Sequence, residues 1–231
     1  MFKKSSSMLL ATSFIAAGGL LGGISTANAA IIVLDFEGLQ DDEAVGDFYN
    51  GGTGSLGSSG TNYGVSFSPA TLALIDSDAG GTGNFANEPS PDTVMFFLDA
   101  NDAILTFAAG FDTGFSFFYT SSTAASVNVY DGLNGTGNLL ASLDLTAQFS
   151  DNCIGDPTGD FCNWTPVGVA FAGIARSIDF GGTANQTAFD DITFGSETPG
   201  GGGPVPVPEP TSLALLGLGL AGLGFMRRRR T

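Results

Sequence analysis

The sequence predicts an all-β fold, a jelly-roll-like β-sandwich of about 11 strands. Helical periodicity is nearly absent between residues 30 and 199, so a helical core is not expected. Short runs rich in β-branched and aromatic residues recur instead, bounded by Gly, Asn, Asp, Ser or Pro, at a spacing of about 10 to 15 residues. Twenty phenylalanines supply the large side chains that a core between two sheets requires.

The predicted strands are short, and several of them alternate apolar and polar residues. In the run that begins at Ser126, Val127 and Val129 face one way while Asn128 and Tyr130 face the other. The phenylalanine clusters within such runs are expected in the core. The predicted strands are 31–36, 65–68, 72–76, 94–98, 103–107, 114–119, 126–130, 139–145, 167–171, 177–180 and 189–194.

Two polar segments interrupt the strands. Residues 40–63 contain too much glycine and too many polar side chains for a strand, so they form either an ordered surface loop or a flexible crossover. Residues 131–138 are rich in Gly and Asn, which tolerate positive φ, and are expected to connect a hairpin.

The N-terminus has the three parts of a Sec signal peptide. Lys3 and Lys4 are followed by the apolar stretch 8–24, and Ala27 and Ala29 form an A-x-A cleavage site. We expect export by the Sec machinery and cleavage by signal peptidase after Ala29. The alternative is an N-terminal membrane anchor that is never cleaved, for which the apolar stretch is short.

The C-terminus combines a proline motif, an apolar segment and a run of arginines. Pro208 and Pro210 flank Glu209 and keep the chain extended before the apolar segment 213–226. Its 14 residues reach about 21 Å as a helix, short of a hydrocarbon core of about 30 Å. This length predicts a short transmembrane helix that stays in the membrane only temporarily. By the positive-inside rule, the terminal arginines place the rest of the protein across the inner membrane. These arginines are Arg227, Arg228, Arg229 and Arg230.

This order of motif, short apolar helix and arginine cluster resembles the PEP-CTERM sorting signal of Gram-negative bacteria. The resemblance implies recognition at Pro208, Glu209 and Pro210 by exosortase, an integral membrane cysteine protease. It also implies removal of the tail and transfer to the cell surface, often in producers of extracellular polysaccharide. An ordinary C-terminal anchor is the alternative. The predicted organisation is a signal peptide at 1–29, a β-sandwich domain at 30–199, a Gly/Pro tether at 200–207 and the sorting signal at 208–231.

The domain between the two signals is strongly acidic. Residues 30–199 contain 22 acidic residues and one basic residue, Arg176, which gives a formal charge of −21. Such a domain repels nucleic acid and anionic membrane surfaces. Self-repulsion favours a bound divalent cation, and calcium (Ca²⁺) is the expected counter-charge. The alternative is a solvated acidic surface that keeps the protein soluble.

The residues that the domain lacks exclude several kinds of catalysis. Because it has no histidine and no lysine, Ser-His-Asp, Cys-His, Ser-Lys and Schiff-base chemistry within the chain are excluded. A pair of carboxylates for glycoside hydrolysis remains possible. The two cysteines, Cys153 and Cys162, are expected to form a disulfide in an oxidising compartment.

Acidic residues at the first and last predicted strands are candidate calcium ligands. Asp35 and Glu37 end the first strand, and Asp190 and Asp191 lie in the last. The terminal strands of jelly rolls commonly pair, so these acids are expected to meet. The arrangement is similar to carbohydrate-binding-module and galactose-binding-like sandwiches, which implies one structural calcium between these residues. The alternative is that the acids lie on exposed edges.

A second candidate calcium loop begins at Asp76. Asp76 and Asp78 alternate and Gly80 follows, but Glu88 lies one position too far along for an EF-hand loop.

These observations predict a non-enzymatic cell-surface or extracellular-matrix protein that associates with exopolysaccharide. The alternatives are a glycan hydrolase that uses only carboxylates, and an adhesin for itself or for a solid surface.

Overall fold

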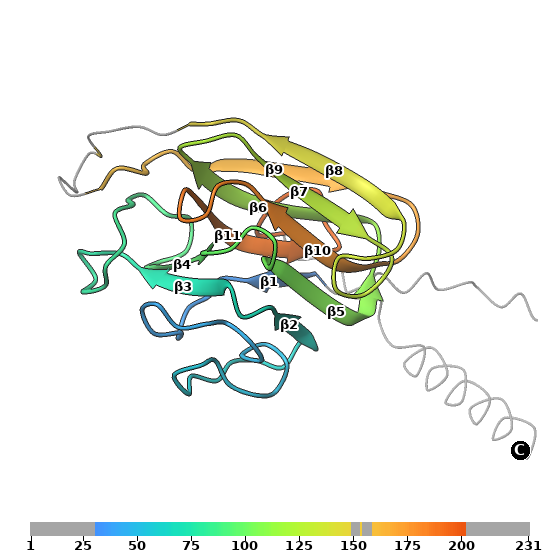
Figure 1. Cartoon of the computed structure of the whole chain (residues 1–231), viewed down its shortest axis with the longest axis horizontal. Coiled ribbons are helices and arrows are strands. Elements are labelled where there is room, and N and C mark those ends of the chain that lie inside the picture. Colours follow the sequence, from blue (N-terminus) through green and yellow to red (C-terminus); the bar gives the residue numbers. More distant parts are fainter. Residues whose placement is uncertain (1–30, 149–152, 154–158, 202–231) are drawn as a thin grey trace, which may run out of the picture. The chain divides into compact units, whose positions relative to one another are not determined.

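The computed structural model describes residues 31–148, 153 and 159–201. These residues form 11 β-strands and no helix, which confirms the predicted fold class (Figure 1). The predicted signal helix and the short transmembrane helix both lie outside the described residues. Within the described part of the chain, no helix is long and apolar enough to span a membrane. The strands are β1 (Ile32–Leu34), β2 (Val65–Phe67), β3 (Thr71–Ile75), β4 (Thr93–Phe97), β5 (Ile104–Phe111), β6 (Gly114–Ser121), β7 (Ala125–Tyr130), β8 (Leu139–Leu145), β9 (Thr165–Ala170), β10 (Ala175–Gly181) and β11 (Thr187–Phe194).

The strands form two antiparallel sheets in the order that defines a jelly roll. One sheet has the order β3-β4-β11-β6-β9, with β1 also paired to β11, and the other has the order β2-β5-β10-β7-β8. The pairs β4–β11, β5–β10, β6–β9 and β7–β8 are nested, as if one long hairpin had been rolled across both sheets. The predicted jelly-roll-like sandwich is therefore confirmed.

Phenylalanine side chains fill the space between the sheets, as the sequence predicts. Phe115, Phe117 and Phe189 from one sheet are fully buried, as is Phe180 from the other. Phe180 and Phe189 meet with their ring centroids 4.8 Å apart, which joins the two layers. The predicted alternation in β7 is also confirmed, because Val127 and Val129 are buried and their neighbours are partly exposed.

Several strand ends differ from their predicted positions, and the backbone explains two of them. β5 continues to Phe111 because Gly110, at φ 79°, accommodates a shift of register against β10. β1 ends at Leu34, since Phe36 has a φ of 62° and turns the chain out of the strand.

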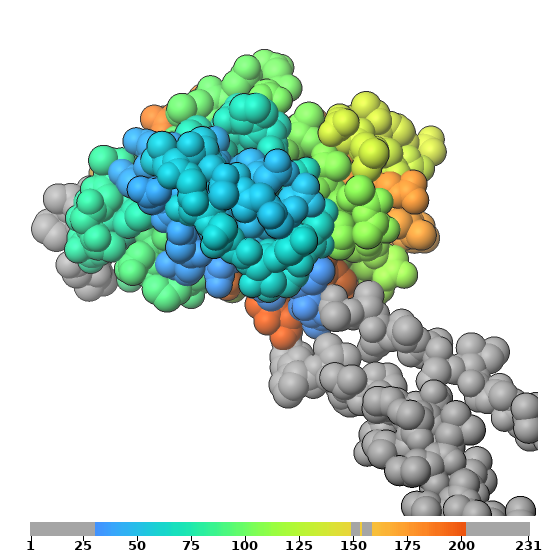
Figure 2. All heavy atoms as spheres, turned by 90° about the horizontal axis from the view of Figure 1, so that it is seen from below, coloured from blue at the N-terminus to red at the C-terminus, as the bar shows by residue number. Residues whose placement is uncertain are grey.

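One buried carboxylate organises the glycine-rich segment 40–63. Glu43 is fully buried and accepts hydrogen bonds from the backbone N–H of Gln40, Leu56 and Ser58 at 2.8, 2.9 and 3.0 Å. Burial raises the pKa of Glu43, but these hydrogen bonds outweigh it and hold the pKa below its ordinary value. The structure therefore favours the ordered loop over the flexible crossover. In Figure 2 the residues before β3, blue to teal, form most of the face turned to the viewer.

Candidate ligand-binding site

The pairing of the terminal strands places Asp35, which follows β1, near Asp191 of β11, whereas Glu37 bonds to the start of β4. Leu34 lies opposite Ile192 in the antiparallel register, so the residues that follow β1 lie beside the middle of β11. Asp35 is close enough to Asp191 for its charge to add to burial, and together these effects raise the pKa of Asp191.

A strained turn follows β1. Phe36 has a φ of 62°, a left-handed conformation that is rare for a bulky residue, and its side chain is fully buried. Its backbone N–H donates to Oη of Tyr49 at 2.7 Å, and its carbonyl accepts from Leu39 at 3.3 Å. Strain of this kind is often found at functional sites. The turn separates two acids, Asp35 and Glu37, that both line one pocket.

This pocket, which we call the carboxylate pocket, has a volume of about 230 Å³. It combines acidic and aromatic side chains, and its lining contains no basic side chain from the described part of the chain. Tyr49 and Tyr63 stack with their ring centroids 6.1 Å apart and their planes at 28°. The volume is below the roughly 300–1,000 Å³ of sites for drug-sized ligands, so the pocket fits one small unit of a larger molecule. The lining residues are Val33, Asp35, Glu37, Phe48, Tyr49, Gly60, Thr61 and Tyr63.

Backbone and side-chain donors hold the two pocket carboxylates. Oε1 of Glu37 accepts from the N–H groups of Asp92 at 3.0 Å and Thr93 at 2.9 Å, at the start of β4. Oδ1 of Asp35 accepts longer bonds, from the N–H of Glu37 at 3.3 Å and the hydroxyl of Tyr49 at 3.5 Å. Asp35 is exposed, and no group among the described residues donates to its Oδ2. This oxygen is available to a ligand.

Asp190, the third predicted ligand, is fully buried and does not line the carboxylate pocket. Its carboxylate accepts from the N–H of Ser90 at 2.7 Å, from Oγ of Ser90 at 2.8 Å and from the N–H of Asp191 at 2.7 Å. Burial outweighs these hydrogen bonds and raises the pKa of Asp190 to about 7. Asp191, at φ 48°, lies where the register of β11 against β6 shifts.

The hydrogen bonds of these acids give no support to the calcium site that the sequence suggests. Calcium takes about six to eight oxygen ligands. The carboxylates of Glu37 and Asp190, however, already accept hydrogen bonds from Ser90, Thr93 and other backbone donors. In the described residues, no group of three or more His, Cys, Asp or Glu is placed to hold a metal ion. Calcium binding by Asp35, Glu37, Asp190 and Asp191 stays a prediction.

The second candidate loop also gathers acids without forming a metal site. Asp76 is buried and Asp78 is exposed, and the charges of both reach Glu88. Burial, together with the charges of Asp76, Asp78 and Asp92, raises the pKa of Glu88 to about 7. The structure thus places Glu88 near Asp76, although Glu88 lies one position beyond the place that an EF-hand loop requires.

The predicted disulfide is present and lies near the only tryptophan. Cys153 and Cys162 are bonded, with their Cα atoms 5.4 Å apart. Trp164 packs edge-on against Phe85 and donates from Nε1 to the carbonyl of Ala86 at 3.1 Å. The loop that contains the disulfide is thereby joined to the segment before β4.

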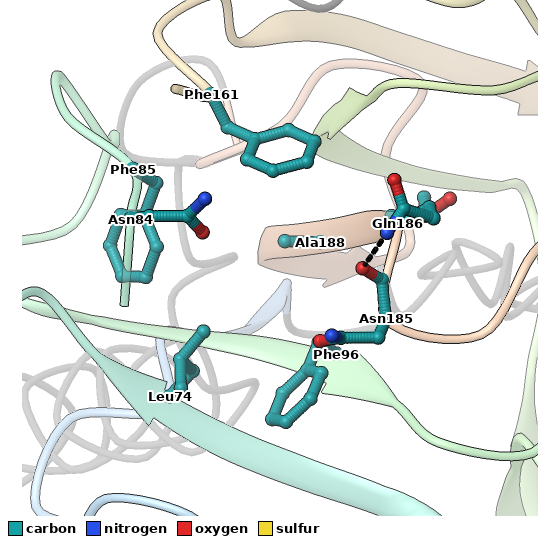
Figure 3. A pocket seen from close by; sticks show the side chains of 9 residues that line it. Leu74, Asn84, Phe85, Phe96, Phe161, Asn185, Gln186 and Ala188 are labelled. Carbon is teal, nitrogen blue, oxygen red and sulfur yellow. Dashed lines mark hydrogen bonds between the residues drawn. The ribbon is translucent and has the colours of Figure 1, made fainter. Parts of the chain in front are cut away.

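A second pocket, which we call the amide pocket, lies over the start of β11. Figure 3 shows Ala188 at its centre, with the rings of Phe85, Phe96 and Phe161 and three carboxamides around it. Its volume of about 30 Å³ is close to that of one water molecule, so it does not admit a sugar ring. The lining residues are Leu74, Asn84, Phe85, Phe96, Phe161, Asn185, Gln186, Thr187 and Ala188.

The tyrosines of the carboxylate pocket were missed by reasoning from sequence. Other aromatic residues with a polar group lie elsewhere: Tyr119 is buried with its hydroxyl on the carbonyl of Thr146, and Tyr130 and Trp164 do not line the pocket. Tyr49 and Tyr63 flank the glycine-rich part of the loop 40–63. Aromatic residues at the ends of a polar loop are the signal that could have identified them.

Comparison with known protein families identifies a sorting motif in the chain. The model of the PEP-CTERM protein-sorting motif matches residues 206–230. The chain carries a PEP-CTERM sorting signal. A search of curated proteins found no significant relative.

The PEP-CTERM signal marks the chain as an exported protein that exosortase processes and that is sorted to the cell envelope or surface. The matched range contains Pro208, Glu209 and Pro210 and the four arginines 227–230, all of which lie outside the described residues. The proposed cleavage residues Ala27 and Ala29 also lie outside them.

Proposed function

We propose that the exported domain is a non-enzymatic cell-surface or extracellular-matrix protein that binds exopolysaccharide through the carboxylate pocket. The producing cell is a Gram-negative bacterium. The observation that carries this proposal is a pocket of sugar-unit size, lined by two carboxylates and two stacked tyrosines, in a chain with a surface-sorting signal.

The chemistry of the pocket suits a sugar. Ionised carboxylates are pure acceptors, and sugar hydroxyls are donors that match them. The apolar face of a sugar ring can pack on an aromatic side chain such as Tyr63, which is only partly buried. Glu37 is held in place by Asp92 and Thr93, so little of its freedom is lost when a ligand binds.

The positions of the perturbed acids favour binding over hydrolysis. A glycoside hydrolase needs two carboxyl groups across the scissile bond, one of them with a raised pKa. The two carboxyls whose pKa is raised to about 7, Asp190 and Glu88, do not line the carboxylate pocket. The alternative of a carboxylate-only hydrolase therefore has less support here than binding without turnover.

Removal of the tail completes the proposal. Exosortase releases the domain from the membrane, and four of the five basic residues that follow the signal peptide leave with the tail. Mass spectrometry of the surface protein tests this step, because a peptide that contains residues 213–230 would show an uncleaved anchor.

Sedimentation of the purified protein with exopolysaccharide from the producing strain tests the binding. We expect binding without release of reducing sugar, and a loss of about tenfold or more in Tyr63→Ala. Tyr130→Ala, a partly buried tyrosine outside the pocket, is the control. Release of reducing sugar would favour the hydrolase. Equal binding of exopolysaccharide by both variants would show that the carboxylate pocket is not the binding site.

A further inference from the structure

The carboxylate pocket carries two acidic side chains, and no basic residue among those that the structure describes lines it. The two acids are Asp35 and Glu37. Arg176 is the only basic residue among those described. It lies on β10, in the other sheet, and its charge acts on Asp131. A ligand that carries negative charge would therefore be repelled, while a positive charge would be attracted.

The aromatic residues of the pocket favour the same sign of charge. A cation over the face of a tyrosine ring is attracted by the ring quadrupole. Tyr49 and Tyr63 stack at 6.1 Å, and Phe48 packs edge-on against Tyr49 at 4.7 Å, so three rings lie together beside the acids. Hard metal ions prefer oxygen ligands alone, whereas organic ammonium groups are recognised by acids and rings together.

The hydrogen-bonding groups of the pocket match a ligand that carries donors. The hydroxyl of Tyr49 receives the N–H of Phe36 and directs its own proton toward Oδ1 of Asp35. The oxygens that face a ligand are thus acceptors, above all Oδ2 of exposed Asp35. An ammonium group brings three donors and no acceptor, which matches this set.

We infer that the carboxylate pocket recognises a sugar unit that bears an ammonium group, as in a polysaccharide of de-N-acetylated amino sugars. This inference rests on the proposed function and names the class of glycan. The pocket volume of about 230 Å³ suits one such unit in a chain. Asp35 pairs with the ammonium, Tyr63 packs on the ring of the sugar, and Glu37 accepts from a hydroxyl.

Isothermal titration of the purified protein with three oligosaccharides tests this inference. The probes are a glucosamine tetramer, which carries ammonium groups, an N-acetylglucosamine tetramer, which is neutral, and a uronic-acid tetramer, which is anionic. We expect the glucosamine tetramer to bind at least tenfold more tightly than the neutral one, and the anionic one not to bind. Raising the salt concentration should weaken the first interaction.

Charge-matched variants separate the pocket from the general acidity of the domain. Asp35→Asn should weaken glucosamine binding about five- to twentyfold, and should weaken N-acetylglucosamine binding by a clearly smaller factor, because the neutral sugar loses an acceptor but no charge pair. Asp144→Asn, exposed on β8, removes the same charge elsewhere and should leave both unchanged. A thermal melt of each variant confirms that it is folded.

The other outcomes overturn the inference in distinguishable ways. An equal loss of glucosamine binding in Asp35→Asn and Asp144→Asn would show nonspecific attraction of a polycation to an acidic surface. Equal affinity for the charged and neutral tetramers, both lost in Asp35→Asn, would overturn the ammonium preference but leave the proposed function standing. Failure of all three probes, with binding to native exopolysaccharide retained, would likewise remove only the amino-sugar assignment. Absence of binding to any glycan would remove both.

Discussion

The carboxylate of Asp190 on β11 accepts two hydrogen bonds from Ser90, one from its backbone N–H at 2.7 Å and one from its Oγ at 2.8 Å. The Oγ of Ser90 also donates to the carbonyl of Asp35 at 3.1 Å. One serine, 100 residues from Asp190 in sequence, thus ties the last strand to the turn that forms the carboxylate pocket. The buried acid acts through structure, by fixing that turn.

Stability should fall as pH rises toward neutrality, because Asp190 is protonated more readily in the folded state. Its folded pKa is about 7 and its ordinary pKa is 3.8, so between these values the folded state binds a proton that the unfolded state releases. The free energy of unfolding should therefore decrease from about pH 4 to pH 7, by about 3–4 kcal/mol at about 1.4 kcal/mol per pKa unit. Glu88, with a folded pKa of about 7, adds an effect of the same sign.

Urea titrations at pH 5 and pH 8 measure this dependence, and Asp190→Asn tests its source. The variant should be less stable at pH 5 than the wild type but should show a smaller difference between the two pH values. If the variant keeps the full pH dependence, Asp190 is not its source.

Removing the charge of Glu43 should loosen the loop 40–63. In Glu43, Oε2 accepts from the N–H of Gln40 and Oε1 accepts from the N–H groups of Leu56 and Ser58. Glu43→Gln replaces one of these oxygens by an NH₂ group, so at least one buried N–H donor faces another donor. Leaving one buried donor unsatisfied costs about 1–3 kcal/mol, so we expect a loss of about 1–3 kcal/mol in the free energy of unfolding. Denaturant unfolding, with exposed Asp144→Asn as the control, measures it; equal stability of the two variants would contradict the role of Glu43.

Reduction of the disulfide should lower stability without unfolding the sandwich. The bond between Cys153 and Cys162 closes a short loop, for which chain entropy predicts about 2–3 kcal/mol. The paired variant Cys153→Ser with Cys162→Ser should show a lower thermal midpoint and an unchanged β-sheet circular dichroism spectrum. Free thiols in the untreated exported protein would show that the bond does not form.

Calcium should have little effect on the thermal midpoint. The carboxylates of Glu37 and Asp190 already accept hydrogen bonds from protein donors, and a calcium ion would have to displace them. We expect melts in millimolar calcium and in chelator to agree within about 1 °C. A rise of several degrees that Asp35→Asn or Asp191→Asn abolishes would restore the calcium site.

The fold could be predicted because its signals are local. All 11 strands appear near their predicted positions, since runs such as the one from Ser126 to Tyr130 alternate in the period that a half-buried strand requires. The pairing of β1 with β11 followed from the jelly-roll class and placed Asp35 beside Asp191. These inferences need only periodicity and topology.

The site was predicted only in part because hydrogen-bond partners are not local. Of the two acids after β1, Asp35 lies beside Asp191 of the last strand, whereas Glu37 bonds to the start of β4. Sequence reasoning could not show that Ser90 would hydrogen-bond to Asp190. Nor does any local pattern show that Tyr49 and Tyr63, at either end of a glycine-rich loop, stack beside Asp35. Carboxylates alone suggested a metal, while carboxylates with aromatic rings suggest a sugar.

The most direct test of the central claim is an NMR titration of the isotope-labelled protein with oligosaccharides prepared from the exopolysaccharide of the producing strain. We expect saturable shifts in the amide resonances of Asp35, Glu37, Thr61 and Tyr63, and none at Asn84 or Gln186 in the amide pocket. Shifts confined to the amide pocket, or no saturable shift at all, would contradict it.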